Sequence, residues 1–528
     1  MPNNAWRLST RLGLTVCAVL SVSPTARLSG QQRPAYEELQ TFSGVLNHVR
    51  LNYVDSVTYA QLVRAAIDGV LHALDPHSLF FSRADFERRN ALERGELAVT
   101  GLSFEEVDSA VTVLSVYPRG PAARAGILPG DRLVTVNDTA VAGLDVDKLA
   151  LRMAGEKGSK IQLQFERGSR LEPDTFTVTL KRDFLKKQSV SLVRMADSVT
   201  GYVRLDDFES TTAAAEVHRA LKDLRGKGMR RLVLDLRGNP GGYVIAAVEV
   251  ASEFLPKGAV VFRTHGRKRD VDTTYTTKRD GEFRDLPMVV LIDGYSASAA
   301  EALSASLQDH DRALIVGRRS FGKALMQADF LVLPSGDDLH LTIGYVLSPS
   351  GRFIQRRYRG LAVQQYLTLA GRGGAAEDTL QVFHTDNGRP VRGGGGVAPD
   401  VALPAPPSLP VWWSVASDSG FDFAVADSVA LVLPATPAGR NAWIAASEQW
   451  RTQLAQPFLG RVRARLQVAA QVDTALENRI GRILALRAAE VRWGPDARDE
   501  FLVRNSADVR TAIGYFAQLP ALLAAPGR

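Results

Sequence analysis

A serine and a lysine, each following an apolar run, have the residue types and positions needed for nucleophilic chemistry. Ser298 comes after the apolar residues 287–292, and Lys323 comes after residues 313–317. α/β enzymes keep catalytic groups just beyond the carboxyl ends of buried strands. A serine hydroxyl becomes a nucleophile when a neighbouring base takes its proton, and an amine is such a base when burial disfavours its charged form. The two residues therefore suggest a serine/lysine dyad.

The segment after Ser298 is expected to begin a helix, because residues 299–308 are mostly good helix formers. Free N–H groups at the start of such a helix can bind an oxyanion. A Ser/His/Asp-type hydrolase of small esters or amides stays open as an alternative. Residues 294–298 nearly form a nucleophile elbow, although its second glycine is absent, and Asp309 and His310 follow. Taken alone, serines at such positions are most often helix caps or surface hydroxyls.

Together the two segments resemble those of the carboxyl-terminal processing proteases, the S41 family of serine peptidases. The matching features are Ser-Ala-Ser-Ala-Ala-Glu at residues 296–301, Phe-Gly-Lys at residues 321–323, and Gln327. In that family the second serine of the first segment is the nucleophile, the lysine is the general base and the glutamine orients the lysine. The resemblance therefore implies that Ser298, Lys323 and Gln327 are catalytic.

A glycine-containing loop follows another predicted strand. Residues 231–236 read as a buried strand, and residues 237–242 give Arg-Gly-Asn-Pro-Gly-Gly before an apolar helix. The loop lacks the Gly-Lys-Ser/Thr ending of a phosphate loop and the glycine spacing of a dinucleotide fingerprint. It resembles the family's Asp-Leu-Arg-x-Asn-x-Gly-Gly loop. This resemblance implies an oxyanion hole made by the N–H of Gly241 or Gly242 together with that of Ala299.

The predicted strands of this region indicate its topology. Those at residues 231–236, 288–292 and 313–317 are separated by helical segments, so we expect βαβ crossovers and a partly parallel sheet. A hairpin is expected within residues 330–347. The family's closing Gly-Ile-x-Pro-Asp motif comes only after a basic, glycine-rich insert at about residues 356–393. We interpret this insert as an exposed hairpin, with a regulatory flap as the alternative.

Residues 96–183 are predicted to form a separate β domain. Their Pro-Ala-Ala-Arg-Ala-Gly and Gly-Asp-Arg-Leu sequences, within the turn cluster at 118–133, resemble those of PDZ domains. A PDZ domain binds an extended C-terminal peptide as an added strand, and N–H groups of one loop hold the terminal carboxylate. The resemblance implies a peptide-binding segment formed by Gly101, Leu102, Ser103 and Phe104. The full Gly-x-Gly form of the loop is missing, so a strand without a ligand role stays open.

The N-terminus has the layout of a targeting segment. Within residues 1–30 a short apolar stretch follows Arg7 and Arg11, as in a signal peptide or a retained N-terminal anchor. The only cysteine, Cys17, lies in this stretch, so a processed chain has neither a disulfide nor a thiol nucleophile. We expect an exported protein that is periplasmic or attached to the outer face of the inner membrane.

Composition excludes several other classes. The net charge of +7 is modest for 528 residues, and no aromatic and basic stripe accompanies it, so we expect no nucleic-acid partner. No metal-ligand cluster or cofactor motif is visible, so we expect neither a metal nor a cofactor.

A signature Ala-Leu-Asp-Pro-His-Ser lies at residues 73–78. We interpret His77 there as part of a turn and not as a catalytic residue.

The sequence thus predicts a multidomain α/β protein. A helical region at residues 31–95 precedes the PDZ-like β domain, an α/β protease core with a mixed sheet and βαβ units follows at 184–405, and a mostly helical extension occupies 406–528. The predicted function is an exported serine endopeptidase that recognises unstructured C-terminal tails of proteins through its PDZ domain. A noncatalytic PDZ scaffold that binds peptides is the main alternative. Oligomer formation, an adaptor, and membrane association through the N-terminus stay open.

Overall fold

The computed structural model describes most of the chain after the N-terminal segment. The described residues are 35–93, 98–107, 110–117, 120–128, 130–142, 146–167, 173–184, 188–361, 365–366, 381–418, 420–467 and 472–524. The predicted signal segment at residues 1–30 lies outside them. The chain divides into two compact units, and the boundary between Ile67 and Asp68 falls inside helix α2 (Tyr59–Leu74).

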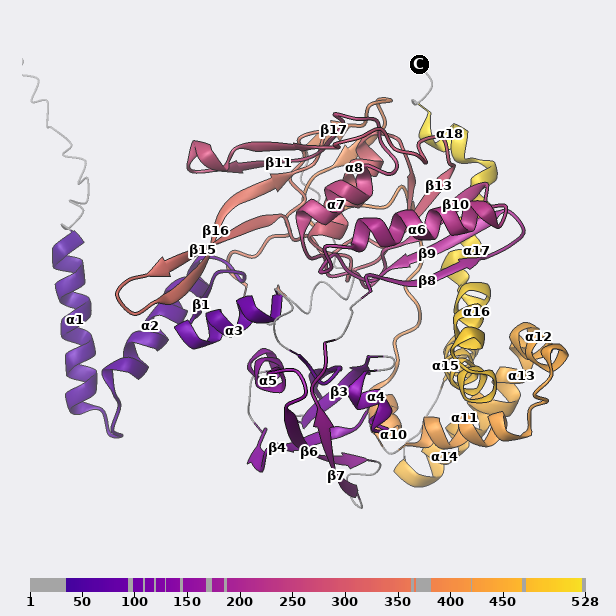
Figure 1. Cartoon of the computed structure of the whole chain (residues 1–528), viewed down its shortest axis with the longest axis horizontal. Coiled ribbons are helices and arrows are strands. Elements are labelled where there is room, and N and C mark those ends of the chain that lie inside the picture. Colours follow the sequence, from indigo (N-terminus) through magenta and orange to yellow (C-terminus); the bar gives the residue numbers. More distant parts are fainter. Residues whose placement is uncertain are drawn as a thin grey trace, which may run out of the picture. The chain divides into compact units, whose positions relative to one another are not determined.

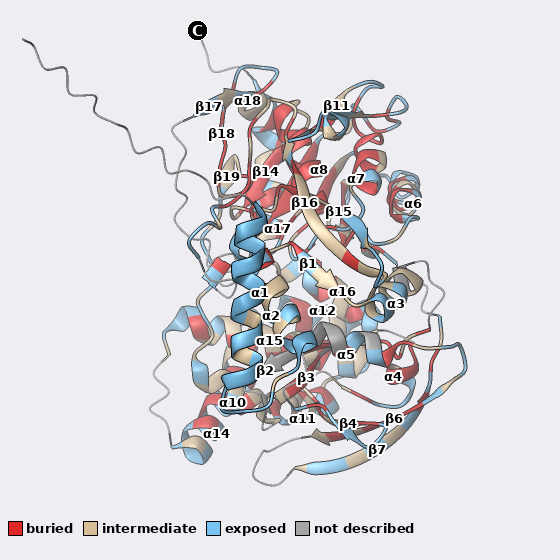
Figure 2. Ribbon diagram, turned by 90° about the vertical axis from the view of Figure 1, so that its left-hand side faces the viewer, coloured by how far each residue is buried: buried red, intermediate tan, exposed pale blue. Residues whose placement is uncertain are grey.

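The first unit is helical, as predicted. Helix α1 (Ala35–Asn52) has no buried residue, and apolar side chains along it, such as Leu39 and Val45, are exposed (Figure 2). In the second unit the chain continues into strand β1 (Leu79–Phe81) and helix α3 (Arg83–Glu93). Strand β1 departs from the expectation of a fully helical segment. It forms because the Leu-Phe-Phe sequence pairs antiparallel with strand β16.

The β domain has the predicted architecture of a small antiparallel sheet with two helices. Its strand order is β2-β3-β4-β6-β7, with β5 paired to β4, and its inward side chains form a separate apolar core. The strands are β2 (Leu102–Val107), β3 (Ala110–Val116), β4 (Arg132–Val136), β5 (Thr139–Ala140), β6 (Lys160–Arg167) and β7 (Asp174–Lys181), and the helices are α4 (Pro121–Arg124) and α5 (Val146–Met153).

A six-stranded mixed sheet forms the centre of the predicted protease core (Figure 1). Its order is β19-β14-β13-β10-β9-β8, in which only β8 is antiparallel to its neighbour. This confirms the predicted mixed sheet with βαβ connections. The strands are β8 (Val190–Met195), β9 (Thr200–Leu205), β10 (Arg231–Asp235), β13 (Met288–Ile292), β14 (Leu314–Gly317) and β19 (Val401–Ala402).

Helices cover both faces of this sheet, as the alternation of side chains along β13 shows. Met288, Val290 and Ile292 face the helices α6 (Ala213–Gly226), α7 (Val244–Ala251) and α8 (Ala299–Asp309). Val289 and Leu291 face the opposite layer, which consists of α17 (Ala507–Gly514), η3 (Tyr515–Ala517) and α18 (Leu519–Leu523). Because successive side chains of a strand point to opposite faces, an all-apolar strand requires two covers. The C-terminal segment supplies the second one.

A second sheet packs at the edge of the core. It contains β11 (Val260–Gly266), β12 (Thr273–Thr276), β15 (Leu325–Val332) and β16 (Asp337–Leu347), together with β1. The predicted hairpin is the β15–β16 pair, which begins earlier than expected, at Leu325. Of the basic insert, the structure describes residues up to 361, then 365–366, and from 381 the hairpin of β17 (Val382–His384) and β18 (Pro390–Arg392).

The C-terminal extension is helical, as predicted. Its elements are α10 (Val411–Asp418), α11 (Phe421–Val432), α12 (Pro437–Ala445), α13 (Ser447–Trp450), the π-helical turn η2 (Arg451–Ala455), α14 (Gln456–Leu466), α15 (Thr474–Trp493) and α16 (Pro495–Asn505). They share an apolar core around Trp443, Trp450 and Phe458. Among the helices of the described residues, none has the length and apolar character to cross a membrane.

Candidate active site

Ser298 occupies a strained turn at the start of α8. It is the residue before the helix, and its backbone has φ 54° and ψ −115°. Residues other than glycine rarely adopt such positive φ values. The conformation costs about 1–3 kcal/mol, so it persists only where the surroundings enforce it. The flanking Ala297 and Ala299 are buried, whereas Ser298 is half-buried. The turn thus presents a single hydroxyl at the helix N-terminus.

Glu301 fixes this turn relative to the loop that carries Lys323. Its Oε2 accepts hydrogen bonds from the backbone N–H of Ser298 at 3.0 Å and from that of Lys323 at 2.7 Å. Its Oε1 accepts from Oγ of Ser320 at 2.5 Å and from the N–H of Gly322 at 2.7 Å. One fully buried carboxylate therefore ties together the two segments that the sequence singled out. Sequence reasoning included Glu301 in the matching motif but gave it no role.

Burial sets the protonation behaviour of both groups. It raises the pKa of Glu301 to about 7, and the four donated hydrogen bonds counteract this in part. Burial also lowers the pKa of Lys323, while the negative charges of Glu301 and Asp75 act in the opposite direction. No described residue accepts a hydrogen bond from Nζ of Lys323. Burial therefore shifts the amine toward its neutral form, and its nitrogen is left without a hydrogen-bond acceptor among the described residues.

Gln327 lies on β15, and its side chain forms a hydrogen bond with Thr342 and not with Lys323. Its Nε2 donates to Oγ1 of Thr342 at 3.1 Å, across the β15–β16 pair. The backbone N–H of Thr342 donates to Oγ of Ser78 at 3.1 Å, and this hydroxyl donates to Oδ2 of Asp75 at 2.7 Å. The predicted orienting residue is thus linked by hydrogen bonds to the Asp75 turn.

The segment around His77 forms the predicted turn and also borders the site. Oδ1 of Asp75 accepts from the N–H of His77 at 2.8 Å and from that of Ser78 at 2.9 Å, which confirms the turn. Nε2 of His77 lies 3.1 Å from Oη of Tyr366. Burial, and then the positive charge of Lys323, lower the pKa of His77 to about 4. The sequence gave no sign that this turn lies so close to the lysine.

The two glycines of the predicted oxyanion loop differ in position. A Cβ atom at Gly241 would lie 2.7 Å from Cβ of Ser298 and 2.9 Å from N of Ala299, whereas one at Gly242 would meet the backbone of Phe208. The N–H of Gly241 donates to Oδ1 of Asn239 at 2.9 Å. No described residue accepts from the N–H of Gly242 or of Ala299. Gly241 is therefore the close neighbour of Ser298, while Gly242 and Ala299 carry the unengaged N–H groups.

His310 is too far from Ser298 to act as its base. It caps the C-terminal end of α8, whereas Ser298 caps the N-terminal end. Eleven residues at a rise of about 1.5 Å each separate the two ends by about 16 Å. The ring of His310 contacts Asp386 and the carbonyl oxygen of Val260, at 2.7 and 2.8 Å. The hydrolase alternative loses its candidate histidine. No group of three metal-ligating side chains occurs within the described residues.

The predicted peptide-binding segment of the β domain lies at a sheet edge. Gly101 has φ 82° and precedes β2, which ends the strand order of its sheet. Leu102 is half-buried and Ser103 is exposed, while Phe104 is buried in the core of the domain. One side of β2 is therefore left for an added strand, and the half-buried Leu102 lies at the start of that strand.

Comparisons with known proteins follow the same division of the chain. Residues 199–361 match the family model for peptidase family S41, and residues 98–182 match that for the PDZ domain. The carboxy-terminal-processing protease of Bartonella bacilliformis is 32% identical over 349 residues, which are 65% of this chain and 78% of that protein. The chain belongs to the S41 family of carboxy-terminal processing proteases. The carboxy-terminal processing protease CtpB of Bacillus subtilis is 26% identical to this S41 peptidase over 64% of the chain and 69% of the relative.

A solved relative resembles this S41 peptidase more loosely in structure. The photosystem II D1 C-terminal processing protease is 25% identical, with 70% of this chain and 87% of that chain covered and a TM-score of 0.42. The family assignment rests on the sequence relatives. The S41 match spans Ser298, Lys323 and Gln327, and the PDZ match spans Gly101 to Phe104.

Proposed function

We propose that this S41 peptidase is a serine endopeptidase in which Ser298 is the nucleophile and Lys323 the general base. The observation that carries this proposal is the shared hydrogen bonding of both backbone amides to Oε2 of Glu301. A buried carboxylate with four donors holds the two loops in one arrangement, which is the positioning that a dyad requires. The lowered pKa of Lys323 supports the role of base.

The proposed reaction proceeds by acyl transfer. Oγ of Ser298 attacks the carbonyl carbon of the peptide bond while the neutral amine of Lys323 takes the hydroxyl proton. The C–N bond then breaks, and the ammonium of Lys323 returns this proton to the leaving amine. Water attacks the resulting ester with Lys323 again as base, which releases the new carboxyl terminus and restores the serine.

The surroundings of Lys323 suit both protonation states. Burial favours the neutral amine before attack, and the charges of Asp75 and Glu301 stabilise the ammonium that forms afterwards. His77, with its pKa lowered to about 4, is uncharged at neutral pH and adds no further positive charge. Gln327 would act at one remove, by holding Thr342 and through it the Asp75 turn. We therefore assign Gln327 a positioning role.

The proposed oxyanion hole consists of the N–H groups of Ala299 and Gly242. No described residue accepts a hydrogen bond from either group, and Ala299 is the first residue of α8, where the helix dipole favours negative charge. Gly241 contributes through its lack of a side chain, because a Cβ there would collide with Ser298.

The PDZ domain would select the substrate. An unstructured C-terminal tail added to the open edge of β2 would place its terminal carboxylate at Gly101 and an apolar side chain against Leu102. The relatives are named for carboxy-terminal processing, which supports proteins with such tails as substrates. The arginines and apolar stretch of residues 1–30 support export, to the periplasm or to the outer face of the inner membrane.

Cleavage of an unfolded protein with an apolar C-terminal tail tests the proposal. The parent chain, Ser298→Ala and Lys323→Ala are compared by mass spectrometry of the products. Ser335→Ala and Lys227→Ala, which change exposed residues away from the site, serve as matched controls. Cutting by the parent and both controls, but by neither site variant, is expected. Tail binding without cutting by the folded parent would favour the noncatalytic scaffold, and cutting by Lys323→Ala would exclude the lysine as base.

A further inference from the structure

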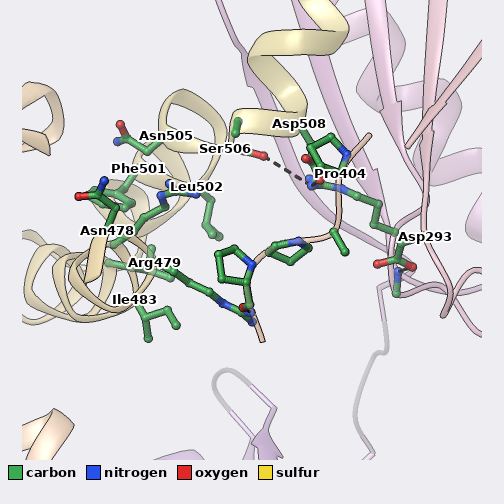
Figure 3. A pocket seen from close by; sticks show the side chains of 18 of the residues that line it. Asp293, Pro404, Asn478, Arg479, Ile483, Phe501, Leu502, Asn505, Ser506 and Asp508 are labelled. Atoms are coloured by element: carbon green, nitrogen blue, oxygen red, sulfur yellow. Dashed lines mark hydrogen bonds and ion pairs between the residues drawn. The ribbon is translucent and has the colours of Figure 1, made fainter. Parts of the chain in front are cut away.

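A cavity that neither Ser298 nor Lys323 lines lies between the core sheet and the C-terminal helices. Its volume is about 730 Å³. One wall comprises residues just beyond the carboxyl ends of β10, β13 and β14, namely Arg237, Asp293 and Arg318, and the other comprises α15 and α16. The proline-rich segment that begins at Pro404 crosses between them (Figure 3). Cavities of this size accommodate small ligands.

The arginines of the sheet wall are satisfied by carboxylates. Arg237 contacts Asp235 at 2.5 Å and Asp508 at 2.9 Å. Arg318 contacts Asp508 at 2.8 Å and the carbonyl oxygen of Pro404 at 2.7 Å. These ion pairs bind the start of α17 to the sheet, so this wall has no surplus of positive charge to offer a ligand.

The arginines of the helix wall are not neutralised in this way. Arg479 and Arg482 lie three residues apart on α15 and therefore on one face of that helix. Arg479 donates to the carbonyl oxygen of Pro407, and Figure 3 shows it extending from α15 toward the proline-rich segment. For the part of the chain that the structure describes, no carboxylate lies within ion-pair distance of either guanidinium. Burial lowers the pKa of both, and the positive charge of Arg482 adds to this at Arg479. At Arg482 the positive charge of Arg510 adds to the lowering, while the negative charge of Asp508, which lies beyond ion-pair distance, opposes it.

We propose that this cavity binds a small molecule with two or more anionic oxygens, either a phosphate ester or a di- or tricarboxylate, between Arg479 and Arg482. Two like charges held together in a partly desolvated cavity repel each other, and an anion would relieve this repulsion. The planar guanidinium matches phosphate and carboxylate groups through paired hydrogen bonds. Ile483 and Leu502 line the same cavity and offer an apolar surface to the rest of the ligand.

The cavity also borders both loops of the proposed active site. Gly238 and Asp293 line it, and the N–H of Gly238 donates to Oδ1 of Asp293 at 2.9 Å. Gly238 belongs to the loop of Gly241, and Asp293 begins the loop of Ser298. A ligand would therefore lie directly behind the catalytic loops. Binding itself is independent of the peptidase chemistry and can be measured in its absence.

Calorimetric titration and thermal unfolding with inorganic phosphate and with citrate test this proposal, with sodium chloride at equal ionic strength as the salt control. The double variant R479Q/R482Q is compared with R461Q/R465Q, which removes the same two charges from exposed positions of α14. Saturable binding by the parent and by R461Q/R465Q, weakened at least tenfold in R479Q/R482Q, is expected. The tighter of the two probes identifies the ligand class.

The single variant R482Q is a control for misfolding of the double variant. No described residue forms a hydrogen bond with the side chain of Arg482, so its replacement removes none. It should fold like the parent and bind phosphate or citrate at least threefold more weakly. Equal binding by the parent and R479Q/R482Q would overturn the proposal. A shift in melting temperature that sodium chloride reproduces in full would do the same, because it would mean ionic strength alone. Running the titrations on Ser298→Ala keeps this result separate from the proposed catalytic function.

Discussion

The backbone amides of Ser298 and Lys323 donate to the same atom, Oε2 of Glu301, at 3.0 and 2.7 Å. The two residues are 25 positions apart in the sequence, and a single carboxylate oxygen fixes the distance between their loops. Its partner oxygen holds Ser320 and Gly322 in the same way. Catalytic groups must be held within narrow limits, so the positioning of the dyad depends on one buried side chain.

Glu301→Gln tests this dependence. The two carboxylate oxygens of Glu301 accept four hydrogen bonds, whereas a glutamine amide has only one acceptor oxygen. We therefore expect kcat to fall at least tenfold with little change in KM. The negative charge of Glu301 raises the pKa of Lys323, so its removal should also shift the acid limb of kcat/KM to lower pH. A pH–rate profile measures both effects, with the exposed Glu87→Gln as control. An unshifted limb would mean that Glu301 acts only through structure.

The proposed base predicts a pH dependence of its own. Only the neutral amine of Lys323 accepts a proton, so activity should rise as pH passes its lowered pKa and reach a plateau above it. Lys323→Arg keeps a positive charge that does not titrate in this range, and we expect about a 10²–10⁴-fold loss. Initial cleavage rates from pH 5 to 9 measure this. A pH-independent rate in the parent would contradict the assignment.

Gly241→Ala should abolish cleavage through a steric effect. Its Cβ would lie 2.7 Å from Cβ of Ser298, and the backbone has φ 102°. Gly258→Ala is the matched control, because Gly258 has φ 84° but nothing within 4 Å of the added Cβ. Gly258→Ala should lose about 1–2 kcal/mol of stability from backbone strain, and Gly241→Ala should lose more because its Cβ also collides with Ser298. Only Gly241→Ala should lose activity, which thermal unfolding and cleavage assays together can establish.

His77 should make stability depend on pH. Its pKa is lowered to about 4 in the folded protein, so the unfolded chain binds an extra proton between about pH 4 and the ordinary value of 6.5. Stability from this residue is complete above pH 6.5 and is lost progressively as pH falls from 6.5 to about 4. Urea unfolding of the parent and of His77→Gln over this range should give a shallower dependence for the variant. The exposed His72→Gln should retain the slope of the parent.

Leu102→Asp tests the edge of β2 as the docking strand for tails. A carboxylate at this half-buried position would lose hydration against the apolar side chain of a bound tail. It would also repel the terminal carboxylate of that tail. We expect at least tenfold weaker binding of an apolar C-terminal peptide. Thr175→Asp places the same charge on β7, at the opposite edge of the sheet, and should bind like the parent. Equal losses in the two variants would point to a general charge effect.

The fold and the dyad candidates were predictable because their signals are local. Apolar runs that end at Ile292 and Gly317 indicate buried strands, and the candidate catalytic residues Ser298 and Lys323 follow each run within a few positions. The connections between parallel strands are almost always right-handed, so a sequence with helices between such strands has few ways to fold. Mixed sheet, PDZ-like domain and C-terminal helices therefore all followed from patterns along the sequence.

The remaining features depend on contacts between distant segments. Gln327 donates to Thr342 because of the register of β15 against β16, which no local pattern encodes. The difference between Gly241 and Gly242 lies in backbone angles and in Asn239. The position of His77 near Lys323 follows from β1 pairing with β16, and a three-residue strand gives almost no periodic signal.

The layer of α17, η3 and α18 also dictates an order of events during synthesis. The strands β10, β13 and β14 emerge from the ribosome long before residues 507–523, which cover their second face. Until then Val289, Leu291 and Val316 form an apolar surface open to water and to other nascent chains. Completion of the core must therefore wait until residues 507–523 have been synthesised, and a chaperone that shields this face in the interval would raise the yield of folded protein.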